Sequence, residues 1–278
     1  MVTLADYGEY ETAWCPGCGN FNILKAVKQA LVAAELQPRD VLFVSGIGQA
    51  AKAPHYLNAN VFNGLHGRAL PVATGAKLAN PRLTVIVESG DGCNYSEGGN
   101  HFLHAIRRNL DLTLLVHNNQ VYGLTKGQAS PTSDPGFVTK TQPQGVEPAP
   151  FNPIAVAVAL RAGLVARAFA GLPDHLAGLI QQALAHPGLA LIDILQPCPS
   201  FNRVNTFAWY KQRCFELPPD YDPENWETAM RTAEEWGERI PVGLIYRNRR
   251  PAFKAGHAPL VGQPVDREAL ARFMESFA

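Results

Sequence analysis

The sequence predicts an α/β fold: a mostly parallel sheet with helices on both faces. Three short apolar runs, residues 41–45, 83–87 and 112–116, each lead into a loop that starts with glycine, aspartate or asparagine. Runs of this length are typical of strands buried on both faces. Segments between them are long enough for crossover helices, and strand, loop, helix and strand in succession form parallel βαβ units.

The other elements follow from spacing and composition. Apolar residues at helical spacing predict a helix over residues 20–34, which Pro38 closes, and the crossover helix covers residues 98–108. Residues 125–153 lack apolar periodicity and are rich in Gly, Pro, Gln, Ser and Thr, which predicts a long, ordered functional loop. The regular pattern then resumes with helix 154–162, strand 164–168, helix 176–185 and strand 189–194. We expect one domain over residues 1–278, with an irregular, aromatic-rich tail from about 196 that suits packing against another chain.

The composition argues against several classes of function. The 278 residues carry 24 Lys+Arg and 24 Asp+Glu, a formal charge of +0, so nothing favours nucleic acid or an anionic membrane as a partner. No apolar run reaches the ~18–20 residues of a membrane span, and the first residues lack the features of a signal peptide. We therefore expect a soluble, cytoplasmic protein. Five cysteines, an odd number, argue against a disulfide framework and favour a metal or redox role for the CxxC pair.

The strongest chemical signal is a Gly-Asp-Gly sequence after one predicted strand and Asn-Asn after the next. Asp91 and the Asn119 side chain, with the Val121 carbonyl as a third group, supply the oxygen ligands that Mg²⁺ takes alongside a diphosphate. Gly90 and Gly92 let the backbone approach such a ligand closely. An ordinary β-turn is the alternative, because Gly-Asp-Gly alone is common.

This pair of motifs resembles the thiamine diphosphate fingerprint, and further motifs extend the resemblance. They are WCPGCG at residues 14–19, SGIG at 45–48, LHGR at 65–68, GGNH at 98–101 and YGLTKGQ at 122–128. In this order, over about residues 12–215, they resemble the β subunit of 2-oxoacid:ferredoxin oxidoreductases. The resemblance implies the diphosphate-binding fold of thiamine diphosphate enzymes. It also implies oxidative decarboxylation of a 2-oxoacid with coenzyme A, giving acyl-CoA, CO₂ and reduced ferredoxin.

The resemblance also implies roles for single residues. Gly48 would contact the cofactor, and His66 would act in catalysis by donating to the diphosphate or the reacting carboxyl. Leu124 would lie beneath the thiazolium. Independently of the resemblance, Lys52 and Lys126 flank two of the ligand loops and are candidates to hold the anions of substrate or coenzyme A. The residues alone leave alternatives open: a buried hydrogen-bonded histidine, a core leucine and two solvated lysines.

Three cysteines match the family's iron–sulfur ligands. Cys15 and Cys18 form the CxxC and Cys198 lies far downstream, whereas the family uses four cysteines for a [4Fe–4S] cluster. Gln49 stands where the family has the fourth cysteine, so the fourth ligand is unassigned. A three-iron cluster, a zinc site and a chain without a cluster remain open. Cys93, next to Gly-Asp-Gly, is expected to be a packed thiol near the cofactor.

The chain has room for only half of a thiamine diphosphate active site, so the pyrimidine-binding domain is expected on a separate α subunit. Residues 198–206, with Arg203, resemble the 2-oxoglutarate branch more than the pyruvate branch. An arginine suits the second carboxylate of a dicarboxylic acid. The alternative functions are a non-oxidative two-subunit 2-oxoacid decarboxylase, which Gln49 favours, and a non-catalytic zinc scaffold.

Overall fold

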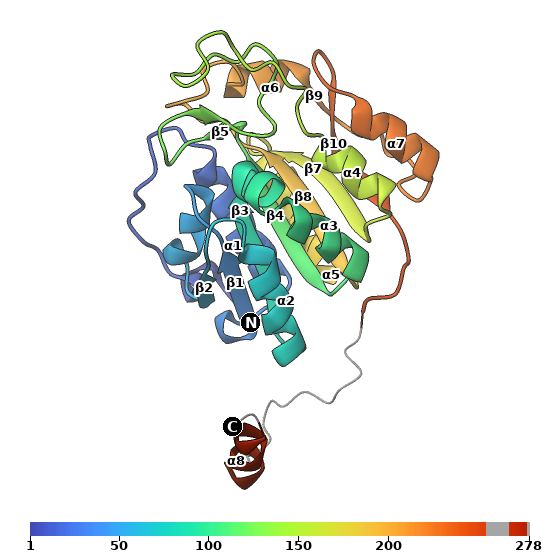
Figure 1. Ribbon diagram of the computed structural model, residues 1–278. Helices are drawn as coiled ribbons and strands as arrows, with labels where there is room; N and C mark the ends of the chain where they lie inside the picture. Colours follow the sequence, from blue (N-terminus) through green and yellow to red (C-terminus); the bar gives the residue numbers. More distant parts are fainter. Residues whose placement is uncertain (254–266, 277–278) are drawn as a thin grey trace.

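A single eight-stranded sheet organises the protein (Figure 1). The computed structural model describes residues 1–253 and 267–276. Across the sheet the order is β2-β1-β3-β4-β8-β7-β10-β9, and among these strands only the β10–β7 pair is antiparallel. Their bounds are β1 Val41–Ser45, β2 Asn60–Asn63, β3 Thr84–Gly90, β4 Leu112–Asn118, β7 Leu164–Phe169, β8 Leu189–Leu195, β9 Cys214–Glu216 and β10 Ile240–Arg247. A separate hairpin pairs β5 (Val121–Tyr122) with β6 (Gln128–Ala129).

Helices cover both faces of the sheet, as the sequence predicts. One face packs against α1 (Asn20–Ala33) and α5 (Pro173–Ala185). The other packs against α2 (Ala69–Ala79), α3 (Gly99–Arg108), α4 (Pro153–Ala159) and α7 (Trp226–Glu234). Two further helices complete those described, α6 (Phe207–Arg213) and α8 (Arg267–Glu275). No helix in the described ranges is both long enough and apolar enough to cross a membrane.

Central strands β4 and β8 are buried along their whole length, which explains their continuous apolar sequences. Because side chains alternate between the two faces of a strand, their few polar residues point in opposite directions. His117 of β4 lies on the α1 side, whereas Asn118 of β4 and Asp193 of β8 lie on the α4–α7 side. All three are almost completely buried.

The predicted strands and the helices over residues 20–34 and 98–108 are confirmed, with one change: β3 continues to Gly90, the first glycine of Gly-Asp-Gly. The expectation of an irregular tail after residue 196 is wrong. That segment forms α6, β9, α7 and β10, and β10 joins the sheet beside β7. Pro241 and Gly243 lie inside β10 and hide its strand pattern, since both residues are unfavourable in strand interiors.

Candidate functional site

The carboxyl ends of β1, β3 and β4 meet at one edge of the sheet and form a cavity, here called the cofactor cavity. Ligands of parallel α/β folds bind at this edge. Every residue that the sequence predicts to bind the cofactor lines it: Gly48, His66, Gly90, Asp91, Gly92, Asn119, Val121 and Leu124. Cys93 lines it too, buried, with its Sγ 3.1 Å from the Gly67 nitrogen.

Two hydroxyl groups from the long loop hold Asp91. The Ser130 hydroxyl donates to Asp91 Oδ2 over 2.5 Å, and Thr132 Oγ1 lies 2.7 Å from the same oxygen. Backbone N–H groups of Gly92 and Asp91 also hydrogen-bond to this carboxylate. Burial raises the pKa of the Asp91 carboxyl, and the two hydroxyls oppose this effect. A bound divalent cation would favour the ionised carboxylate.

Two hydrogen bonds hold Asn119 in the turn that follows β4. Asn119 Oδ1 accepts a hydrogen bond from the Val121 backbone N–H (3.1 Å), and its backbone oxygen accepts one from Asn202 Nδ2 (3.1 Å). Between them Gln120 has a φ of 58°, in the left-handed region. This geometry sets Asn119 and the start of β5 beside Asp91 on the cavity wall.

His66 is held beside Glu97 because the backbone at Gly67 packs closely against the backbone of Glu97. Its Nδ1 lies 3.0 Å from Glu97 Oε2, at ion-pair distance but without hydrogen-bond alignment, and the Tyr122 hydroxyl donates to the same carboxylate over 3.3 Å. Gly67 has a φ of 72°, and a Cβ there would lie 2.5 Å from the Glu97 carbonyl carbon. Only glycine fits this position, so Gly67 brings His66 and Glu97 together.

The two predicted anion-binding lysines do not line the cofactor cavity. Lys126 is exposed on the turn between β5 and β6, with a φ of 76°. Lys52 is half-buried in the short helical turn Ala50–Tyr56, just beyond the cavity wall. Their proposed contacts with substrate or coenzyme A stay predictions.

Cys15, Cys18 and Cys198 line a second cavity, the cysteine cavity, although 180 residues separate Cys18 from Cys198. Burial raises the pKa of Cys18 to about 11 and also raises that of Cys198. In the part of the chain that the structure describes, no three His, Cys, Asp or Glu side chains lie close enough to hold one metal ion. An iron–sulfur cluster is larger than a single ion and is bound by more widely spaced thiolates.

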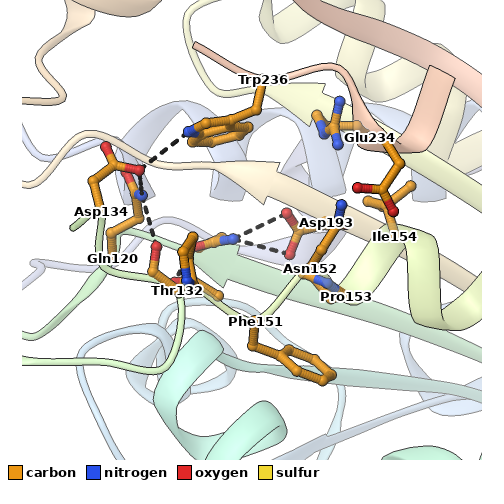
Figure 2. Close-up of a pocket in the computed structure, with 13 residues that line it drawn as sticks. Gln120, Thr132, Asp134, Phe151, Asn152, Pro153, Ile154, Asp193, Glu234 and Trp236 are labelled. Atoms are coloured by element: carbon orange, nitrogen blue, oxygen red, sulfur yellow. Dashed lines mark hydrogen bonds between the residues drawn. The ribbon is translucent and has the colours of Figure 1, made fainter. Parts of the chain in front are cut away.

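The sequence does not reveal a third cavity, here called the Asp193 cavity, of about 210 Å³ on the α4–α7 side (Figure 2). Asn118 Nδ2 donates to Asp193 (3.0 Å to Oδ2), and Asn118 Oδ1 lies 2.8 Å from Thr132 Oγ1. Since Thr132 also contacts Asp91, a continuous polar network joins the two cavities. Burial raises the pKa of Asp193 to about 6, against the hydrogen bonds that Tyr95 and Asn118 donate to it.

This fold and cofactor cavity define the diphosphate-binding chain of a thiamine diphosphate enzyme. Residues 44–194 match the family model "Thiamine pyrophosphate enzyme, C-terminal TPP binding domain". Residues 198–261 match the family model of the C-terminal part of the pyruvate ferredoxin oxidoreductase beta chain.

Similar proteins show to which family of thiamine diphosphate enzymes the chain belongs. One is subunit beta of 2-oxoacid:ferredoxin oxidoreductase 1 from Aeropyrum pernix, 44% identical over 92% of this chain and 87% of that protein. Another is the beta subunit from Saccharolobus solfataricus, 47% identical over 84% and 81%. A solved structure of 2-oxoglutarate:ferredoxin oxidoreductase from Magnetococcus marinus covers 99% of this chain and 91% of its own, at 36% identity and a TM-score of 0.88. The chain belongs to the β subunits of the 2-oxoacid:ferredoxin oxidoreductases, which confirms the resemblance.

Proposed function

We propose that this chain forms the diphosphate-binding half of an enzyme that oxidatively decarboxylates 2-oxoglutarate with coenzyme A and reduces ferredoxin. The observation that carries the proposal is the gathering of all eight predicted cofactor-binding residues around one cavity at the carboxyl edge of the sheet. The 2-oxoglutarate branch has further support. The KorB subunit of a 2-oxoglutarate oxidoreductase from Mycobacterium tuberculosis is 45% identical over 70% of this chain.

In this proposal thiamine diphosphate supplies the carbanion chemistry. The residues of this chain orient the cofactor and hold the cation that neutralises its charge. Asp91, Asn119 and the Val121 carbonyl hold Mg²⁺, and the hydroxyls of Ser130 and Thr132 keep Asp91 in place. His66 donates to the diphosphate or to the reacting carboxyl. The pyrimidine-binding domain lies on the α subunit, and the assembly acts in the cytoplasm.

The cysteine cavity fits an iron–sulfur cluster in its donor set. Three thiols line it, and buried polar atoms of Asn20, Gln49 and Gln196 there have no hydrogen-bond partner in the described part of the chain. We propose that Cys15, Cys18 and Cys198 hold a [4Fe–4S] cluster, which would supply one-electron transfer between the cofactor and ferredoxin.

Substrate assignment can be tested with the reconstituted αβ enzyme and a viologen acceptor. We expect a higher kcat/KM for 2-oxoglutarate than for pyruvate or branched 2-oxoacids. A preference for pyruvate would contradict the substrate but not the reaction class. Because Gln49 also favours a non-oxidative decarboxylase, the products decide between the two reactions: succinyl-CoA supports oxidation, and an aldehyde supports the alternative.

The metal site gives an independent prediction. Asp91→Ala and Asn119→Ala should each abolish retention of thiamine diphosphate, because each removes an oxygen ligand that no other side chain replaces. Titration calorimetry with thiamine diphosphate and Mg²⁺ measures this. Asp220→Ala, at an exposed position, is the control. Wild-type affinity in both site variants would refute the assignment.

A further inference from the structure

Gln49 stands between the two cavities at the place where the family has a cysteine. It lines both the cofactor cavity and the cysteine cavity, and only Asn119 and Gly123 share that property. Its backbone oxygen accepts a hydrogen bond from Trp14 Nε1 (2.9 Å), so its main chain is tied to the residue that precedes the CxxC. Gln49 is therefore built into the wall that separates cofactor from cysteines.

The Gln49 side chain carries a polar atom without a partner. Its Oε1 is buried and accepts no hydrogen bond from residues 1–253 or 267–276, which the structure describes. A buried carbonyl oxygen without a donor is unfavourable, so native proteins rarely leave one unpaired. Gln49 Oε1 thus has lone pairs available at the wall of the cysteine cavity, which is what a metal ligand requires.

Two other amides in the cysteine cavity also have an unpartnered atom, but their geometry differs. Asn20 uses its oxygen with His117 Nδ1 (2.8 Å), which leaves an N–H donor and no free acceptor. Gln196 also has an unpartnered Oε1, but its Nε2 donates to Cys18 Sγ (3.4 Å) and to the Pro197 oxygen (2.7 Å), so its amide lies beside an existing thiol ligand. Only Gln49 combines a free acceptor oxygen with the position of the family's fourth ligand.

We propose that Gln49 Oε1 is the fourth protein ligand of the [4Fe–4S] cluster, with Cys15, Cys18 and Cys198 on the other three irons. This inference rests on the cluster that the proposed function includes. A neutral amide oxygen replaces a thiolate, so the cluster carries one negative charge less, and net charge is one of the factors that set cluster potentials. An oxygen also binds iron less tightly than a soft thiolate does, so the iron at Gln49 should be the most readily lost.

The experiment uses the αβ holoenzyme, purified without oxygen, in four variants beside the wild type. Gln49→Leu keeps the side-chain volume and removes the ligand, whereas Gln49→Glu keeps an oxygen and removes the N–H donor. Gln49→Cys restores the family ligand. Gln29→Leu is the matched control, because Gln29 also has a buried Oε1 without a partner among the described residues but lines neither cavity. Iron and acid-labile sulfide per chain, with electron paramagnetic resonance of the oxidised and reduced protein, are the readouts.

We expect wild type, Gln49→Glu and Gln29→Leu to hold a four-iron cluster, and Gln49→Leu to show the signal of a three-iron cluster. Mild ferricyanide treatment should convert the wild type to the three-iron form but leave Gln49→Cys intact. Wild-type spectra and iron content in Gln49→Leu would overturn the proposal, as would loss of the fourth iron in Gln29→Leu. Absence of iron from an enzyme that still turns over 2-oxoglutarate would overturn it too. A four-iron enzyme without 2-oxoglutarate turnover would contradict the proposed function and leave the ligand assignment standing.

Discussion

Asp91 depends on side chains that no sequence motif marks. Strand-end positions made Asp91 and Asn119 predictable, because polar residues after parallel strands converge at one edge of the sheet. Ser130 and Thr132 were not predictable individually. They reach Asp91 from a loop without periodicity, and only the folded path of that loop, about 40 residues downstream, shows which hydroxyls arrive.

Loss of these hydroxyls should weaken metal binding. Ser130→Ala and Thr132→Val each remove one contact to Asp91 Oδ2. A hydrogen bond to a charged group contributes about 1.5–3 kcal/mol, so we expect Mg²⁺-dependent binding of thiamine diphosphate to weaken about tenfold or more in each variant. Titration calorimetry checks this. Thr141→Val, in the same loop but with an exposed hydroxyl that, among the described residues, contacts only the Thr139 hydroxyl, should bind as the wild type does.

Asp193 should make stability fall as the pH rises. Its pKa is about 6 in the folded chain and near the ordinary 3.8 when unfolded, so the folded state holds the extra proton between these values. The stabilisation is complete below about pH 4 and is lost as the pH rises through about 6. The difference between the two pKa values corresponds to roughly 3 kcal/mol of unfolding free energy.

Asp193→Asn should remove this component. Urea unfolding of the metal-free chain at several pH values measures it as a difference between variant and wild type. The subtraction is needed because burial lowers the pKa of His175 and His186, which changes stability in the opposite direction over the same range. A parallel pH dependence in wild type and Asp193→Asn would show that Asp193 does not titrate there.

At the scale of elements, α7 and β10 are attached through one buried arginine. Arg167 of β7 donates to the backbone oxygens of Ala233 (3.1 Å), Glu235 (3.3 Å) and Pro241 (3.3 Å). Ala233 and Glu235 lie at the end of α7, and Pro241 lies near the start of β10. The contact explains how a segment with a weak strand pattern becomes part of the sheet.

Arg167→Met should therefore destabilise the protein by several kcal/mol. The substitution removes the guanidinium donor from three carbonyl oxygens, of which that of Ala233 keeps a hydrogen bond from Asn152, and it leaves the buried Asp193 without a nearby cation. Urea unfolding measures the loss. The control is Arg231→Met on the exposed side of α7, where we expect a change within about 0.5 kcal/mol. Equal effects in both variants would contradict the role of Arg167.

Local patterns predicted the first two thirds of the chain better than the last third, and the reason is physical. Strands β1, β3, β4 and β8 are short and apolar because they are buried on both faces, so composition identifies them. Helix α7 begins at Trp226, directly after Asn225, whose side chain caps it, within a proline-rich stretch that suggests a loop. Tertiary contacts such as those of Arg167 decide the structure there, and a single sequence does not show them.

On the scale of the whole molecule, the cofactor cavity opens beside exposed apolar side chains. Ile47 and Leu124 line it and are 36% and 42% exposed, and Leu65, next to His66, is 74% exposed. A group of large apolar residues around a polar site is typical of a surface that a partner covers. The chain therefore presents half of an active site with an apolar rim that suits the α subunit.

Leu65→Glu should weaken assembly with the α subunit without unfolding the chain, because an exposed side chain contributes little to the folded core. Placing a carboxylate in a desolvated interface should raise the dissociation constant at least about tenfold, or about 1.4 kcal/mol. Leu160→Glu is the matched control: Leu160 is 44% exposed at the end of α4, just before β7 begins and so at the opposite edge of the sheet. Sedimentation of the mixed subunits measures assembly, and thermal unfolding of each chain checks its fold. Because only Leu65 adjoins the cofactor cavity, an equal loss of assembly in both variants would mean that the α subunit does not bind specifically at this rim.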